Sequence, residues 1–351
     1  MKDNISDRLT KEATPLIDRD SVTFVWKGNS APHLVGDITG WDEGKPIRLE
    51  RHGRWLWTYR TIFPNDAYIE YNYVIDGQSL GDPYNPRQTA NGVGGYNNYF
   101  SMPAYKPTGL ARFSNRVHHG ALTHFSVPTD SMLFGNQRTV HLYQPPVDKP
   151  VPLVVVWDGQ DYLSRVHLNY IVDNLLAQGR IRPIALAFVN NGGEKSRSIE
   201  YSPNDATLWW LYHRVLPLAK KELNLVNIKH NPGQFGVVGA SMGGLMAMYT
   251  GVRFPGIFGN VLSQSGAFSL GRFDMVIYDL LECGEQRPLK IWMDAGIYDL
   301  PGLLDANRKM HTLLVQRGYP VSYREYNAGH NFPSWRDEIW KGLEILYGVK
   351  K

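Results

Sequence analysis

Hydrophobic and polar residues alternate over short distances between residue 21 and about residue 103. Runs such as VTFVWKG, RWLWTYRTIF and IEYNYVID are separated by Gly, Pro, Asn and Asp. Alternation with a period of two is typical of strands buried on one face, and the separating residues supply the backbone angles of turns. Several short strands at this spacing predict a β-sandwich. Residues 84–98, YNPRQTANGVGGYNN, are polar and glycine-rich and predict a loop.

From about residue 116 the pattern changes, because apolar strand candidates now alternate with helical patterns. VPLVVVWDG, RPIALAFVN, QFGVVGAS and KIWMDAG are each followed by a stretch with helical periodicity. This order predicts a mostly parallel sheet that is covered by helices on both faces. The expected organisation is an N-terminal extension, a β-sandwich, a linker and an α/β domain, over residues 1–20, 21–103, 104–115 and 116–351.

The motif GASMG, residues 239–243, follows an apolar strand candidate and precedes the helical pattern LMAMYTGVRF. Strand, sharp turn and helix form the context in which G-x-S-x-G carries a nucleophilic serine. The small residues let the turn tighten, so Ser241 is expected to project above the sheet. The helix N-terminus and the Met242 N–H would then favour a developing oxyanion. These features predict Ser241 as the nucleophile of an α/β-hydrolase fold.

A serine hydroxyl requires a general base, and in this fold the chain order is serine, acid, histidine. Two histidines, His311 and His330, follow Ser241. His311 lies inside a predicted amphipathic helix. His330 lies in NAGHNFPSW, a predicted loop between the final strand and the last helix, which is where the base of this fold belongs. His330 is therefore the predicted base.

The acid is expected after the preceding strand, in KIWMDAGIYDL. Asp294 and Asp299 are the two candidates there, and Asp305 is a weaker third. The strand is predicted to end at Asp294, with a turn beginning directly after it. Asp299 lies beyond that turn, where the loop of His330 should arrive, so Asp299 is predicted to complete the triad. Asp294 is expected to bond backbone groups of the turn instead.

Two further segments are predicted to line the site. The second N–H of the oxyanion hole is expected from WDGQ, where Gly159 or Gln160 follows a strand and glycine permits close backbone approach. Arg197 and Glu200 lie in NNGGEKSRSIEY, a predicted loop at the same edge of the sheet. Arg197 suits an anionic or catecholate group of the substrate, or else pairs with Glu200 at the surface. Trp157 is the third predicted substrate contact.

Composition narrows the class of protein. The formal net charge of +4 is spread along the chain without the basic stripe of a nucleic-acid-binding protein. The single cysteine, Cys283, allows no intrachain disulfide, and the N-terminus lacks the apolar core of a signal peptide. No apolar run approaches the roughly 18 residues of a membrane span. We therefore expect a cytoplasmic protein with no membrane partner, no metal site and no cofactor.

The segment VVGASMGGLMAMYTGVRFPGIFGNVLSQSGAF resembles the esterase-D-like esterases, and most closely the enterochelin (ferric enterobactin) esterases. In those enzymes a DGQ segment, an R-x-x-E loop, a VLSQSG strand and a final GHN histidine occur in the same order, which here spans about residues 120–348. The related esterases also place their acid after a G-x-x pair, which GIYD, ending at Asp299, matches. VGDITGWDE, GRWLWTYRTIF, IEYNYVIDG and DPYNP resemble early-set β-sandwich modules related to glycogen-binding domains.

The resemblance implies a serine carboxylic ester hydrolase that acts through an acyl-enzyme on a siderophore trilactone, as an iron–siderophore complex, or on related aromatic esters. One alternative is a feruloyl or acetyl xylan esterase, because those enzymes pair a similar module with this hydrolase. A non-enzymatic carbohydrate-binding protein is the alternative from another class, in which tryptophans of the sandwich stack on sugar rings: Trp26, Trp41, Trp55 and Trp57. The short linker favours a sandwich that shapes the substrate entrance over a remote sugar anchor.

Overall fold

The computed structural model describes residues 5–42, 44–92 and 94–349. Its contacts divide the chain into two units. The first comprises Met1–Pro107, Gly296–Pro301 and Tyr326–Ser334, and the second comprises Thr108–Ala295, Gly302–Glu325 and Trp335–Lys351. No helix within the described residues combines the length and apolarity that crossing a membrane requires.

The first unit is a β-sandwich. A four-stranded antiparallel sheet has the order β1-β2-β6-β5, formed by Leu16–Asp18, Ser21–Lys27, Leu56–Ile62 and Glu50–Arg51. The opposing strands are β3 (His33–Gly36), β4 (Ile47–Arg48), β7 (Tyr68–Ile75), β8 (Gln78–Leu80), β9 (Gln88–Ala90) and β10 (Tyr96–Ser101).

Aromatic residues hold the two sheets of the sandwich together. Phe24 of β2 packs edge-on against Tyr71 of β7, with ring centroids 5.0 Å apart, and against Phe100 of β10 at 5.7 Å. All three side chains are fully buried. Such edge-to-face pairs stabilise a core beyond the burial of their area alone, so this cluster is the centre of the unit.

Two parts of the unit differ from the sequence-based expectation. The predicted N-terminal extension contains a short helix, α1 (Ile5–Arg8), and strand β1, which pairs with β2. The predicted loop over residues 84–98 contains β9 and the first residues of β10. The polar residues of β10 are partly buried: Asn97 donates to Glu70 Oε2 at 2.8 Å, and Asn98 donates to the Asn85 oxygen at 2.9 Å. Backbone pairing and these buried bonds, which residue type does not reveal, make the segment strands.

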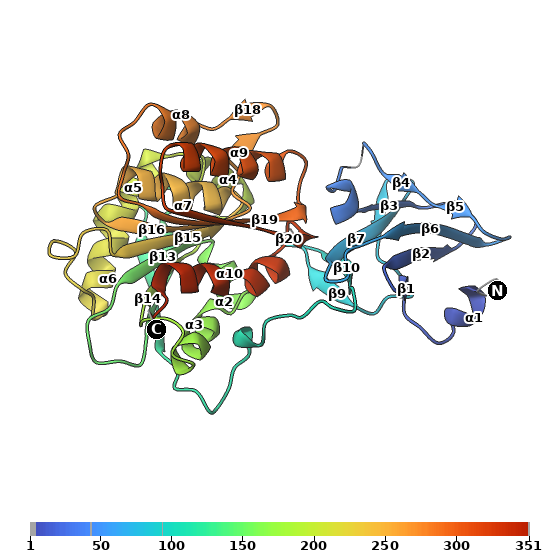
Figure 1. The fold of residues 1–351 in the computed structure, drawn as a ribbon, viewed down its shortest axis with the longest axis horizontal. Helices are drawn as coiled ribbons and strands as arrows, with labels where there is room; N and C mark the ends of the chain where they lie inside the picture. The colour runs from blue at the N-terminus through green and yellow to red at the C-terminus, as the bar shows by residue number, and fades with distance from the viewer. Residues whose placement is uncertain (1–4, 43, 93, 350–351) are drawn as a thin grey trace. The chain divides into compact units, whose positions relative to one another are not determined.

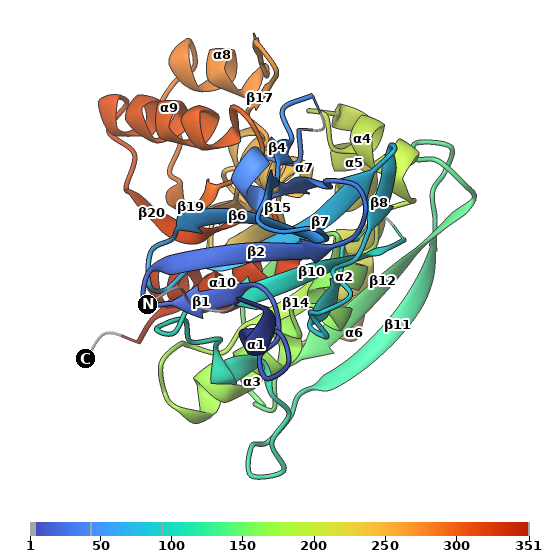
Figure 2. The same ribbon diagram turned by 90° about the vertical axis from the view of Figure 1, so that its right-hand side faces the viewer.

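The second unit is a mostly parallel sheet with helices on both faces, as predicted. Its strand order is β11-β12-β14-β13-β15-β16-β19-β20. The pairs β14–β13, β13–β15, β15–β16 and β16–β19 are parallel, whereas β11–β12 and β12–β14 are antiparallel. The strands are Ala121–Pro128 (β11), Gln137–Gln144 (β12), Leu153–Trp157 (β13), Ala185–Val189 (β14), Phe235–Ala240 (β15), Phe258–Gln264 (β16), Lys290–Tyr298 (β19) and Val321–Gly329 (β20). The β11–β12 hairpin is long and clearly seen in Figure 2.

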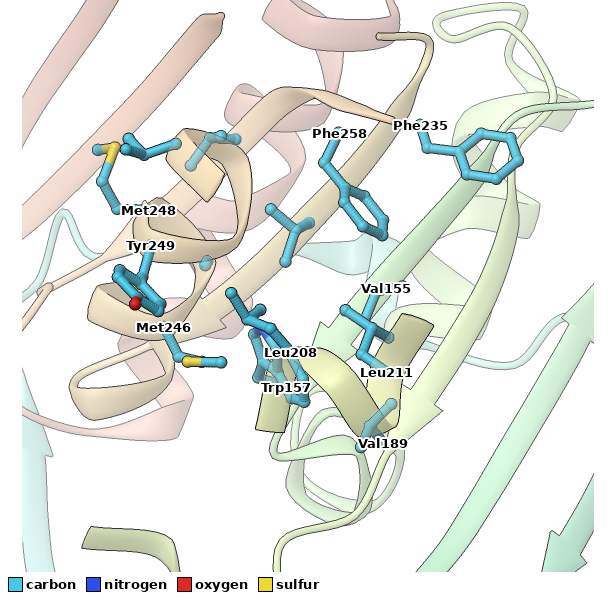
Figure 3. Packing of buried hydrophobic residues seen from close by; sticks show 14 of the residues in the cluster. Val155, Trp157, Val189, Leu208, Leu211, Phe235, Met246, Met248, Tyr249 and Phe258 are labelled. Carbon is cyan, nitrogen blue, oxygen red and sulfur yellow. The ribbon is translucent and has the colours of Figure 1, made fainter. Parts of the chain in front are cut away.

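Helices cover this sheet in two layers (Figure 1). One face carries α7 (Met242–Arg253), α8 (Ile277–Glu282) and α9 (Leu303–Gln316), and the other carries α2 (Gly159–Ser164), α3 (Leu168–Ala177) and α10 (Phe332–Tyr347). The remaining helices are α4 (Glu194–Glu200), α5 (Asp205–Trp210), a π-helical turn (Leu211–Val215) and α6 (Leu216–Glu222), with a small hairpin of β17 (Ser269–Leu270) and β18 (Phe273–Asp274). Figure 3 shows residues of the core formed by α7 and the sheet, among them Met246 of α7 and Phe258 of β16.

The predicted linker is divided between the units. Residues up to Pro107 belong to the first unit, and those from Thr108 belong to the second. The side-chain amide of Asn174 in α3 donates to the backbone oxygens of Leu110, at 2.7 Å, and of Arg112, at 3.0 Å. The second half of the linker is thus bound to α3 by hydrogen bonds to a buried side chain.

Candidate active site

Ser241 occupies the turn between β15 and α7. Its backbone has φ 59° and ψ −124°, an unusual region for a residue with a side chain. Its N–H donates to the backbone oxygen of Gln264 at 2.9 Å. Strained backbone of this kind persists where surrounding structure imposes it, and it is the conformation of a nucleophile elbow.

Glycines allow the strand and the helix to approach each other at this turn. A Cβ on Gly239 would lie 2.2 Å from the backbone oxygen of Gly243, and one on Gly243 would lie 2.9 Å from Oδ2 of Asp158. Any side chain at Gly239 would therefore push the helix away from the strand. The spacing of the motif is explained by this close contact.

Three backbone N–H groups predicted to form the oxyanion hole lie at helix N-termini. Met242 is the first residue of α7, and Gly159 and Gln160 are the first two residues of α2. N–H groups in the first turn of a helix have no acceptor within the helix and carry its positive dipole end. A Cβ on Gly159 would lie 2.5 Å from the carbonyl carbon of Phe188, so glycine is required for this approach of α2 to β14.

Asp158 and Arg197 form a bidentate ion pair beside the elbow. Asp158 is buried, and its Oδ1 and Oδ2 accept from Arg197 Nε at 2.7 Å and Nη2 at 2.6 Å. Asn191 also donates to Oδ1 at 2.6 Å. Arg197 Nη2 further donates to the backbone oxygen of Ala240 at 3.3 Å. Burial opposes the guanidinium charge, but the Asp158 carboxylate outweighs it and raises the pKa of Arg197.

The alternative of a surface pair between Arg197 and Glu200 is therefore wrong. Glu200 is buried and accepts instead from Arg138 Nη2 at 2.7 Å and from the Phe134 N–H at 2.9 Å. Burial raises the pKa of Glu200, although both donors oppose that shift. The two residues lie one helical turn apart on α4, but each reaches a partner elsewhere in the fold.

Trp157 also lies away from solvent. Its side chain is 1% exposed and packs in the core with Leu208 and Met246 (Figure 3). Its ring lies 5.4 Å from that of Tyr201. Trp157 and Glu200 are both buried and have partners inside the protein, which is the environment of structural residues rather than of substrate contacts.

His330 and Asp299, the predicted base and acid, lie together in the first unit. His330 directly follows β20 and Asp299 directly follows β19. Nδ1 of the histidine lies 2.6 Å from Oδ1 of the aspartate, whose side chain is shielded from solvent. Oδ1 also accepts from the Leu300 N–H at 2.8 Å. This bond fixes the ring orientation and directs Nε2 away from the acid.

The rival candidates have other partners. Asp294 is fully buried and accepts from Trp292 Nε1 at 2.8 Å and Gln264 Nε2 at 3.2 Å, and burial raises its pKa to about 7. The expected bonds of Asp294 to backbone of a turn are wrong, because β19 continues to Tyr298. His311 lies in α9 and stacks on Tyr323, with centroids 4.9 Å apart. Asp305 is largely exposed and pairs with Arg308 at 3.8 Å.

The sandwich tryptophans do not form a common binding platform. Trp26 packs on Tyr73 with ring centroids 5.2 Å apart, Trp41 Nε1 donates to Asp37 Oδ1 at 2.9 Å, and Trp57 Nε1 donates to the Gly28 oxygen at 3.0 Å. Trp55 is 50% exposed. Three of the four rings are thus engaged within the sandwich, as strand tryptophans usually are.

Sequence reasoning missed Asp158, Asn191 and Asp37. Asp158 stands directly after a buried strand and before a glycine, a position where polar residues of parallel sheets often serve a site. The partners of Asn191 and Asp37 depend on tertiary contacts and leave no local signal. Among the described residues there is no cluster of three or more His, Cys, Asp or Glu suited to a metal ion.

A mostly parallel sheet with a strained serine at a strand–helix turn defines an α/β-hydrolase. Residues 131–345 match the protein family described as Putative esterase, so the chain belongs to this family of esterases. It is 32% identical over 230 residues to the iron(III) enterobactin esterase of Dickeya dadantii, an alignment that covers 60% of this chain and 52% of that protein. The chain thus matches about half the length of this curated relative.

Solved structures show the same fold. The enterobactin esterase from Shigella flexneri, solved in the presence of enterobactin, aligns over 99% of both chains with a TM-score of 0.77 and 20% identity. A ferulic acid esterase from Anaeromyces mucronatus, in complex with ferulic acid, aligns over 68% of this chain and 95% of its own, with a TM-score of 0.55 and 15% identity. The predicted fold class and family resemblance are confirmed.

Proposed function

We propose that this chain is a serine carboxylic ester hydrolase in which Ser241 is the nucleophile, His330 the general base and Asp299 the orienting acid. The observation that carries the proposal is the strained backbone of Ser241 between a parallel strand and a helix. The hydrogen bond between His330 and Asp299 supplies the second requirement, a histidine held in one orientation.

The proposed mechanism assigns one step to each of these side chains. His330 Nε2 takes the proton of the Ser241 hydroxyl as its oxygen attacks the ester carbonyl carbon. The Met242 N–H and an N–H of Gly159 or Gln160 hold the oxyanion of the tetrahedral intermediate. His330 then gives the proton to the leaving alkoxide, which leaves an acyl-enzyme. Water, activated by the same histidine, releases the acid and restores Ser241.

Asp299 stabilises the charged imidazole and holds its Nδ1 proton during these steps. Arg197 was a candidate clamp for an anionic substrate group, and it is three-quarters shielded from solvent while bound to Asp158. Its two strong bonds to that carboxylate favour a role in holding the strand end at Ala240, because a guanidinium engaged bidentately has few donors left for a ligand.

The proposed substrate is an enterobactin-type trilactone, in its iron complex, with the iron as part of the substrate. Similarity to iron(III) enterobactin esterases supports this choice, and the family match supports an ester. A feruloyl-type ester is the second candidate, which the likeness to a ferulic acid esterase favours. Both substrates present an aromatic acid or catechol group next to an ester. A cytoplasmic location and the absence of a cofactor remain part of the proposal.

The test of the mechanism compares Ser241→Ala and His330→Ala on a p-nitrophenyl ester. We expect each variant to lose about 10³-fold or more in kcat while remaining folded, because nucleophile and base act as one unit. His311→Ala is the matched control, since that histidine lies in α9 against Tyr323. Near-normal kcat for Ser241→Ala would refute the serine mechanism, and an inactive His311→Ala beside an active His330→Ala would refute the assignment of the base.

Substrate class is tested by a direct comparison of kcat/KM on ferric enterobactin and on methyl ferulate with the wild-type chain. Preference for the trilactone supports the first candidate. Release of ferulate without cleavage of the trilactone supports the second. In both cases Ser241→Ala must abolish the reaction, which separates enzymatic turnover from slow spontaneous hydrolysis.

A further inference from the structure

A short turn of the sandwich contacts both loops that carry the acid and the base. The turn follows β3 and is a 3₁₀ helix over Asp37–Thr39, within the motif VGDITGWDE. A Cβ on Gly329, the residue before His330, would lie 2.0 Å from Cγ and Oδ1 of Asp37. A Cβ on Gly40 would lie 2.7 Å from Cδ of Pro301, in the loop that follows Asp299. The mechanism proposed above assigns no role to this turn.

The Asp37 carboxyl is held rigidly. It is 3% exposed, its Oδ2 accepts from the backbone N–H of Glu70 at 2.8 Å, and its Oδ1 accepts from Trp41 Nε1 at 2.9 Å. Glu70 is itself buried and accepts from the side-chain amide of Asn97 at 2.8 Å. Because both oxygens are bound and the neighbouring carboxyl is fixed as well, Asp37 cannot turn away from Gly329.

Burying the Asp37 carboxyl next to other carboxyls lowers the stability of the folded protein. Burial raises the pKa of Asp37 well above its usual range, and the nearby carboxyl of Glu70 raises it further, while the two N–H donors oppose the shift. The charge of Asp299 acts in the same direction at longer range. A buried carboxyl beside two others is less favourable than an apolar side chain of the same size. Groups retained against such a cost concentrate at functional sites.

Gly329 is explained by the same contact. Gly329 does not have a positive φ, so its backbone conformation is one that residues with a side chain can also adopt. The obstacle to a side chain is the Asp37 carboxyl, which packs directly on the Cα of Gly329. The Asp37 carboxyl thus packs as a wedge against the backbone of Gly329, the residue directly before His330. The His330 ring is in turn bonded to Asp299.

We propose that Asp37 is a positioning residue, whose carboxyl sets the backbone of Gly329 and thereby the orientation of the His330 ring against Asp299. This inference rests on the proposed function, because it assigns Asp37 to the catalytic histidine. Displacement of a general base by a fraction of an ångström weakens proton transfer in the transition state without removing substrate contacts. The expected signature is a loss in kcat with little change in KM.

The first experiment measures p-nitrophenyl acetate hydrolysis by Asp37→Ala and Asp37→Asn, with kcat expressed per serine titrated by a phosphonate. We expect Asp37→Ala to lower kcat by roughly 10- to 100-fold with KM nearly unchanged. Asp37→Asn keeps the shape of the side chain but turns one accepting oxygen into a donor, which loses the bond from Glu70 N–H or from Trp41 Nε1, so it should recover part of that loss. Asp82→Ala is the matched control, because Asp82 is also a buried sandwich carboxyl and bonds Thr14 and Tyr71 instead.

A second experiment remains informative if Asp37→Ala folds poorly. Gly329→Ala should lower kcat, because its Cβ meets the Asp37 carboxyl. The double variant Gly329→Ala/Asp37→Ala should have a higher kcat than Gly329→Ala alone, because the clashing atoms are gone. Wild-type kcat in Asp37→Ala, a harmless Gly329→Ala, or equal kcat losses in Asp82→Ala and Asp37→Ala would each overturn the inference.

Ser241→Ala and His330→Ala are measured in the same assay. If either retains activity, the proposed function fails. If both are inactive and Asp37→Ala is normal, the function stands and the positioning role of Asp37 fails.

Discussion

Asp294 and Asp299 are close in sequence but have contrasting surroundings. Asp294 is fully buried among Trp292 and Gln264, and burial raises its pKa to about 7. Asp299 accepts from the Leu300 N–H and lies 2.6 Å from Nδ1 of His330. The first carboxyl is therefore suited to a structural role in the core, whereas the second can stabilise a charged imidazole.

This contrast predicts unequal effects of two isosteric substitutions. Asp299→Asn should lower kcat by roughly 10²- to 10⁴-fold with KM nearly unchanged, because an amide favours the wrong histidine tautomer. Asp294→Asn should change kcat less than about tenfold, since Asp294 bonds the side chains of Trp292 and Gln264. Both are measured on one p-nitrophenyl ester after circular dichroism confirms folding. A severe loss in Asp294→Asn alone would reverse the assignment, and mild effects in both would indicate a Ser–His dyad.

Residue patterns predict Ser241, His330 and Asp299 as site residues because each follows a recognisable strand. They did not reveal how the strands end. The Ala-Gly pair after Asp294 resembled the start of a turn, but Gly296 lies within β19. A Cβ on Gly296 would lie 2.2 Å from the backbone oxygen of Ala328 in β20, so this glycine serves a close contact between chain segments. Contacts of that kind are absent from local sequence.

At the scale of elements, a histidine joins the start of the second unit to α3. His119 Nδ1 lies 2.8 Å from Asp173 Oδ2, and His119 Nε2 lies 3.0 Å from the Ser114 oxygen. The Gly120 N–H donates to the other oxygen of Asp173 at 3.1 Å. Burial lowers the pKa of His119, but the bonds to Asp173 and Ser114 outweigh it, and the pKa is raised above 6.5.

The raised pKa predicts how the free energy of unfolding depends on pH. The folded state binds the His119 proton more tightly than the unfolded state, so this stabilisation is fully present below pH 6.5 and is lost as the pH rises through the folded value. His119→Gln should therefore destabilise the protein more at acidic than at alkaline pH, by about 1 kcal/mol. Urea unfolding at either side of neutrality measures the difference. His124→Gln, on the exposed strand β11, is the control. An equal effect of His119→Gln at both pH values would contradict the ion pair.

At the scale of the whole molecule, the hydrophobic pattern predicts an all-β half followed by an α/β half. The structure contains a β-sandwich and a mostly parallel sheet covered by helices. The contact-based units differ from that division in one respect. Gly296–Pro301 and Tyr326–Ser334, which carry Asp299 and His330, cluster with the sandwich. Ala328 of β20 pairs in parallel with Tyr68 of β7, and Asp37 packs on Gly329. Pairing between residues so distant along the chain cannot be deduced from periodicity, so the sequence assigned both loops to the hydrolase half.

This grouping changes the expected result of removing the sandwich. From the linker alone, deletion of residues 1–103 should impair bulky esters more than small ones. Because the deletion also removes Tyr68 and Asp37, which support the loops of His330 and Asp299, we now expect p-nitrophenyl acetate hydrolysis to fall by about 100-fold or more as well.

The measurement compares kcat/KM of residues 104–351 and of the full chain on p-nitrophenyl acetate and on a bulky aromatic ester. Circular dichroism and labelling of Ser241 by a phosphonate show whether the shortened chain is folded and its elbow intact. If a folded, shortened chain hydrolyses the small ester at the full rate, the acid and base keep their positions without the sandwich. A selective loss on the bulky ester would then support a sandwich that shapes the substrate entrance.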